Sequence, residues 1–169
     1  MEKFWNTIHF FAYKLMNKWF MPSKILMKWF NSSLSRKLLA INGRTPEMAM
    51  KDFKFAMTDK RVGQSSFWAF GIMFAMPFVF CFALQCFYIA FVAKPKNPGS
   101  FFFVMLLYGS VSGIVNYFLL LHKDKYIKYF KKFEKQPREW KVKWAWISVG
   151  VILFPFLVLI GSFIAMLPK

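Results

Sequence analysis

The side chains in this sequence best suited to redox or metal chemistry are two cysteines and two histidines. Cys81 and Cys86 lie five positions apart inside an uninterrupted apolar stretch. On a helix this spacing turns them about 140° from each other, which disfavours a disulfide or a shared metal ion. His9 and His122 are the two histidines of the chain, so a haem or metal site built on histidine would need both of them. We interpret His9 as lying on the polar face of a surface helix and His122 as lying at a helix end.

The other motifs of catalysis are missing from the sequence. It has no Ser-His-Asp set, no carboxylate pair, no glycine-rich phosphate loop and no Cys-x-x-Cys motif. We therefore predict that the chain is not an enzyme and that it has no catalytic residue, cofactor or metal site.

The composition is typical of a membrane protein. Hydrophobic residues make up 57% of the chain and aromatic residues 22%, and the formal net charge is +17. The apolar residues gather in three blocks without charged residues, at 66–93, 100–121 and 144–167, each long enough to cross a bilayer. We predict an all-α membrane protein with three transmembrane helices, and kinks at Pro77 and Pro155.

The distribution of basic residues predicts the orientation. Residues 1–65 contain 12 Lys and Arg, and residues 122–143 contain nine. The short outer turn 94–99, rich in proline and glycine, contains two, and the C-terminal tail contains one. Because basic residues concentrate on the cytoplasmic side, we predict that the N-terminus is inside and the C-terminus outside.

Residues 1–64 have the pattern of basic amphipathic helices lying in the membrane interface, at about 3–20, 23–40 and 46–57. Ser23 and Thr45 are the expected N-caps of the second and third helices. No small-residue cleavage site follows the first helix, so we expect no removable leader. The residues predicted to anchor the chain in the interface are Phe4, Trp5, Ile8, Phe11, Leu15 and Trp19 in the first helix and Trp144 and Trp146 before the third span.

Residues 122–143 are predicted to form a basic extension on the inner side. We expect one helix from residue 100 to about 135, with an aromatic face of Tyr126, Phe130 and Phe133 projecting into water or along the interface. Simple adhesion to anionic lipid and docking of acidic partner subunits both remain open as roles for the basic residues. The lysines predicted to make these contacts are Lys14, Lys18, Lys128, Lys131, Lys132 and Lys135.

Small residues in the spans indicate where helices approach closely. The clearest motif is Gly109-Ser110-Val111-Ser112-Gly113, and weaker ones are Gly71 with Ala75 and Gly161 with Ala165. Packing within the chain and packing against another subunit are both compatible with these motifs. The amides of Gln85 and Asn116 are predicted to hydrogen-bond between helices.

No Asp, Glu, Lys, Arg or His lies inside the three spans, which disfavours an ion-coupled or proton-coupled carrier. We expect a non-catalytic accessory subunit of a multisubunit complex, in a bacterial inner or a mitochondrial inner membrane. The expected partners are lipids, including anionic ones, and other membrane subunits. The alternative is a small self-associating protein that forms pores or perturbs membranes, like a holin or toxin. The basic residues follow membrane topology, so nucleic acid is not an expected partner.

Overall fold

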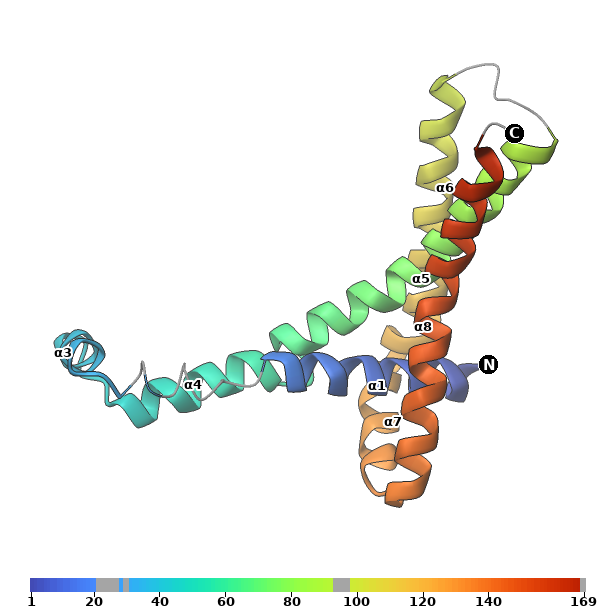
Figure 1. Ribbon diagram of the computed structural model, residues 1–169. Helices are drawn as coiled ribbons and strands as arrows, with labels where there is room; N and C mark the ends of the chain where they lie inside the picture. Colours follow the sequence, from blue (N-terminus) through green and yellow to red (C-terminus); the bar gives the residue numbers. More distant parts are fainter. Residues whose placement is uncertain (21–27, 29–30, 93–97, 168–169) are drawn as a thin grey trace. The chain divides into compact units, whose positions relative to one another are not determined.

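The computed structural model describes residues 1–20, 28, 31–92 and 98–167. The described part is helical, as the sequence predicts (Figure 1). Its elements are α1 (Glu2–Phe20), α3 (Ser33–Ile41), α4 (Pro46–Thr58), α5 (Gln64–Phe91), α6 (Pro98–Asn116), the π turn η1 (Tyr117–Leu121), the 3₁₀ turn η2 (His122–Asp124), α7 (Lys125–Glu134) and α8 (Arg138–Met166).

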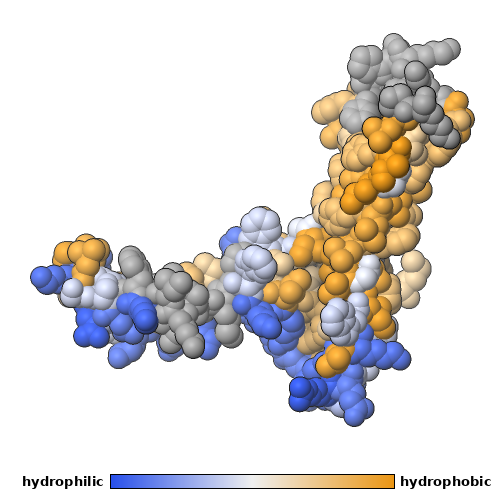
Figure 2. Space-filling model, viewed as in Figure 1, coloured by the Kyte–Doolittle hydropathy of each residue, from blue (hydrophilic) through white to orange (hydrophobic). Residues whose placement is uncertain are grey.

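The prediction of three helices long and apolar enough to span a membrane is confirmed. They are Gln64–Phe91, Phe102–Glu134 and Arg138–Met166. Pro77 and Pro155 lie inside the first and the third. Figure 2 shows hydrophobic residues over α5, α6 and α8, and hydrophilic residues gathered at the end formed by α7 and the start of α8. Of the predicted outer turn, residues 94–97 lie outside the described residues, and α6 already begins at Pro98.

The helix predicted from residue 100 to about 135 is helical over most of this range, but it is not one unbroken helix. α6 ends at Asn116, and a π turn and a 3₁₀ turn follow before α7 begins. Lys123 and Asp124 have φ values of 58° and 54°, a left-handed conformation that side-chain-bearing residues rarely adopt. This kink redirects the chain so that α7 packs its aromatic face inward instead of projecting it. Tyr126, Phe130 and Phe133 are all buried.

The chain divides into two compact units, which are described separately. The first comprises Met1–Ala12 and Phe70–Lys169, and the second comprises Tyr13–Ala69. The core of the first unit joins Ile8 of α1 to Met73 and Met76 of α5 and to Leu120 of the π turn. The start of α1 is therefore packed against the second apolar stretch.

In this unit α1 buries polar residues that its amphipathic pattern predicts to face water, together with the apolar Ile8 and Ala12. Asn6, Thr7 and His9 are 0–1% exposed, whereas the aromatic Phe4 is 41% exposed. The polar side chains can be buried because Asn6 and Thr7 donate hydrogen bonds to backbone carbonyl groups. Tertiary packing thus overrides the amphipathic pattern in the first three turns of the helix.

The second unit follows local sequence signals closely. Thr45 caps α4 as predicted, because its side chain accepts a hydrogen bond from the Met48 amide at 3.2 Å. Gly43, after the C-cap of α3, has φ +63°, which ends that helix in a left-handed turn. The helix predicted over 23–40 begins outside the described residues at Ser23. Its described end is α3, which starts only at Ser33 and is capped by Ser32.

A tight turn connects α4 to α5 within the second unit. The Asp59 carboxylate accepts hydrogen bonds from the amides of Arg61 and Val62 at 2.7 and 2.8 Å. The Ser66 hydroxyl donates to the carbonyl groups of Asp59 and Lys60. Gly63 lies so close to this turn that an added Cβ would be 2.4 Å from the Asp59 carbonyl oxygen. The turn therefore requires glycine there.

Candidate functional site

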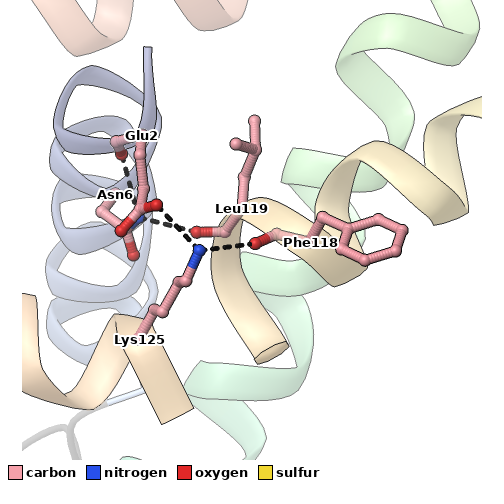
Figure 3. Close-up of polar contacts among 5 residues, drawn as sticks. All are labelled: Glu2, Asn6, Phe118, Leu119 and Lys125. Atoms are coloured by element: carbon pink, nitrogen blue, oxygen red, sulfur yellow. Dashed lines mark hydrogen bonds and ion pairs between the residues drawn. The ribbon is translucent and has the colours of Figure 1, made fainter. Parts of the chain in front are cut away.

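The N-terminal helix caps the break in the second apolar stretch. Where a helix is interrupted, its last carbonyl groups lose their regular partners and need other donors. The Asn6 side-chain amide donates to the Leu119 carbonyl at 2.8 Å and to the Glu2 carbonyl at 2.9 Å. The Lys125 ammonium donates to the Phe118 carbonyl at 3.2 Å (Figure 3). Two side chains thus satisfy two adjacent carbonyl groups at the break.

Lys125 also forms an ion pair with Glu2. The Lys125 Nζ lies 2.8 Å from the Glu2 carboxylate, and the side chains are 26% and 38% exposed. The hydrogen bond from Lys125 lowers the pKa of Glu2, so the carboxylate is charged at neutral pH. The first residues of α1 are therefore connected to the first residue of α7 directly through this pair.

A second set of side-chain hydrogen bonds joins α1, α6 and α5 further into the apolar region. The Trp5 indole nitrogen donates to the Asn116 side-chain oxygen at 3.0 Å. The Asn116 amide nitrogen donates to the carbonyl groups of Met73 and Ser112 at 3.0 and 2.9 Å. The Ser112 hydroxyl donates to the Phe74 carbonyl at 2.6 Å. The prediction that Asn116 bonds between helices is confirmed. The other predicted amide, Gln85, has a buried Oε1 without a partner among the described residues.

The glycines of the strongest small-residue motif face an aromatic ring. An added Cβ at Gly109 or Gly113 would be 4.0 or 3.8 Å from the Phe74 ring. Ser110 is exposed, and its hydroxyl bonds only to the Leu106 carbonyl of its own helix among the described residues. The motif therefore provides a flat surface for α5, while Ser110 points away from it.

The weaker small-residue pairs are placed differently from one another. Gly161 lies beside Phe87, whose ring is 3.7 Å from an added Cβ. Gly71 is exposed, with open space where a Cβ would stand. Ala75 and Ala165 are half-buried.

His9 lies in an aromatic cage in the first unit. Its ring centroid is 4.4 Å from that of Phe70, 5.2 Å from that of Phe130 and 5.6 Å from that of Tyr126. The side chain is fully buried, and neither ring nitrogen has a hydrogen-bond partner among the described residues. Burial lowers the pKa of His9 to about 3, because the cage cannot solvate an imidazolium. The prediction that His9 lies on the polar face of a surface helix is therefore wrong, because the side chain is buried.

The other histidine is not part of this cage. His122 lies in the turn after the π helix, with its ring centroid 6.1 Å from that of Tyr117 and 6.0 Å from that of Phe118. Among the described residues, no group of three or more His, Cys, Asp or Glu side chains could hold a metal ion. The prediction of no cofactor or metal remains a prediction.

Some residues predicted to anchor the chain at the interface form an aromatic cluster within the first unit. The Trp140 ring lies 6.1 Å from Phe11 and 6.0 Å from Trp144, and Trp144 lies 6.1 Å from Phe4. Trp146, in contrast, is 73% exposed. The cluster attaches the start of α1 to the start of α8.

The remaining predicted contact residues divide between the core and the surface. Trp5 packs against the core cluster and Ile8 belongs to it, whereas Leu15 and Trp19 are exposed. All the lysines predicted to contact lipid or acidic partners are exposed: Lys14, Lys18, Lys128, Lys131, Lys132 and Lys135.

We call the contact of α1 with the helix break at Phe118 and Leu119 and with the start of α7 the junction. The sequence alone did not single out three residues that build this junction: Glu2, Asn6 and Lys125. The spacing of Glu2 and Asn6, four positions apart on one helix face, was the available signal. Their partners lie more than 100 positions away, so no local pattern could identify them. Comparisons with protein-family models, with curated proteins and with solved structures found no match for this chain.

Proposed function

We propose that this chain is a non-catalytic subunit of a larger membrane protein complex, to which it supplies three transmembrane helices. The proposal depends on how little of its apolar surface the chain buries by itself. Only 22%, 17% and 17% of the apolar windows of the three long helices are buried. Surfaces of this kind need lipid or other apolar helices to cover them.

A hollow on α8 supports contact with another helix rather than lipid alone. It has a volume of about 380 Å³ and is lined by Ile147, Gly150, Val151 and Phe154. An added Cβ at Gly150 would meet nothing within 4 Å. A small, exposed residue in the lining of an apolar hollow lets the backbone of a second transmembrane helix approach closely.

The polar groups of the junction support a structural role. The side chains of Asn6, Lys125 and Asn116 all hydrogen-bond to backbone carbonyl groups, and the Trp5 indole donates to Asn116. Side chains engaged in this way hold helices together and are poorly placed to act as acids, bases or nucleophiles.

The basic residues support an orientation and a set of lipid contacts. Residues 1–65 and 122–143 hold 21 of the 24 Lys and Arg residues, so the N-terminus is inside, the C-terminus is outside, and both segments meet anionic headgroups. The N-terminal helices lie at the interface in this arrangement. The composition suits a bacterial inner membrane and a mitochondrial inner membrane equally.

The test is native mass spectrometry of the endogenous protein after extraction in a mild detergent. We expect unlike subunits in fixed stoichiometry. Gly150→Leu should reduce their recovery, whereas Val149→Leu, on an exposed position of the same helix, should not. A monomer would contradict the proposal. A homogeneous ring of this chain would instead favour the self-associating, holin-like or toxin-like alternative.

A further inference from the structure

A basic cleft lies at the kink that follows the second apolar stretch. It has a volume of about 420 Å³ and belongs entirely to the first unit. It is lined by the first turn of α1, the kink and one side of α7. The lining residues are Glu2, Lys123, Lys125, Lys128, Tyr129 and Lys132.

The charges in this cleft do not cancel. Glu2 is the one acidic residue among the lining residues, and its carboxylate is paired with Lys125 at 2.8 Å. Lys123, Lys128 and Lys132 make no ion pair with any residue that the structure describes. Three positive charges therefore line one cleft whose lining residues include no carboxylate besides Glu2, an arrangement that favours an anionic ligand.

The backbone brings these charges together. Lys128 and Lys132 are four positions apart on α7 and lie on one side of it. Lys123 reaches the same cleft because the left-handed conformation of Lys123 and Asp124 turns the chain just before α7. Strained backbone of this kind is common where a structure holds a ligand.

The position of the cleft along the chain selects a lipid over a soluble anion. It begins directly after Leu121, the last residue of the uncharged apolar stretch. Phe118 and Leu121 are 56% and 43% exposed and can contact acyl chains. A phosphate bound next to them would lie where the headgroup layer meets the hydrocarbon.

From this geometry we infer that the cleft binds the phosphate of an anionic membrane lipid, held mainly by Lys123, Lys128 and Lys132. The inference assigns one binding site to the lipid contacts of the proposed function. It rests on that proposal only in placing the cleft at the membrane surface. It does not depend on whether the chain has partner subunits.

The test measures phosphatidylglycerol bound to the full chain in zwitterionic nanodiscs, by native mass spectrometry during a lipid titration. The variant K123Q/K128Q/K132Q removes the three cleft charges. The matched control K51Q/K54Q/K143Q removes three exposed lysines that neither line the cleft nor belong to the lysines predicted to contact lipid. We expect the cleft variant to bind at least tenfold more weakly and the control to change less than threefold, because each cleft lysine acts directly on the phosphate. Equal losses in both, or no loss in the cleft variant, would overturn the inference.

Two further experiments distinguish loss of lipid binding from misfolding, and a lipid ligand from a soluble one. K123R/K128R/K132R keeps the charges and should keep the affinity within about threefold, and a loss of affinity in this variant would also overturn the inference. Glycerol phosphate at millimolar concentration should displace little lipid. Full displacement would assign the cleft to a soluble phosphate and overturn the lipid assignment. Recovery of partner subunits with the cleft variant tests the proposed function separately.

Discussion

Replacing His9 with phenylalanine tests the aromatic cage most directly. The imidazole is fully buried against Phe70, Tyr126 and Phe130, and neither of its nitrogens has a partner in the described part of the chain. Phenylalanine keeps the aromatic contacts and removes the two unpartnered polar atoms, each of which costs about 1–3 kcal/mol to bury. At pH 8 we therefore expect His9→Phe to be at least as stable as the wild type.

The pH dependence gives the sharper result. The pKa of His9 falls from 6.5 to about 3 on folding, so below pH 6.5 the unfolded chain binds a proton that the folded chain excludes. Stability from this group is complete above pH 6.5 and decreases as the pH falls toward 3. Since pH 5 lies about 1.5 units below the ordinary value, we expect the wild type to lose about 2 kcal/mol between pH 8 and pH 5 through His9.

The assay is equilibrium unfolding of the protein in mixed micelles, followed by tryptophan fluorescence at pH 8 and pH 5. The difference between the two pH values should be smaller by about 2 kcal/mol in His9→Phe than in the wild type. The control His122→Phe removes the other histidine, outside the cage, and should leave the loss through His9 in place. Equal pH dependence in the wild type and His9→Phe would refute the reasoning, because it would mean that His9 is accessible to protons when folded.

Three further predictions concern stability, each measured by the same unfolding assay. Asn6→Ala should destabilise the protein by about 1–3 kcal/mol, because the Leu119 carbonyl loses its side-chain donor. Asn116→Ala should cost at least as much, because three hydrogen bonds of this side chain are lost. Gly63→Ala should cost about 1–3 kcal/mol or more, because the new Cβ would be 2.4 Å from the Asp59 carbonyl oxygen.

Matched controls make these stability predictions specific. Gly71→Ala adds the same methyl group where nothing lies within 4 Å, so it should change stability by less than about 1 kcal/mol. Ser110→Ala removes a hydroxyl that bonds only to its own helix in the described structure and should be similarly mild. If Gly71→Ala were as costly as Gly63→Ala, the contact at Asp59 would not be the cause.

The amino-acid sequence by itself determined the features that depend on neighbouring residues. The three apolar stretches are visible because a helix that crosses a bilayer needs about 20 apolar residues in succession. The N-cap at Thr45 and the helix end at Gly43 follow from the conformations that these residue types favour. Likewise, the spacing of the α7 aromatics predicted that they share one face.

Only the tertiary structure decided that polar residues of α1 are buried and where the second apolar stretch bends. The amphipathic pattern predicts that Asn6 and His9 face water, but carbonyl groups at a distant helix break give Asn6 its partner, and aromatic rings of α5 and α7 enclose His9. The left-handed turn at Lys123 and Asp124 contains no proline or glycine from which the sequence could predict it. Its cost is offset by contacts with α1 more than 100 positions away, and such contacts leave no local signal in the sequence.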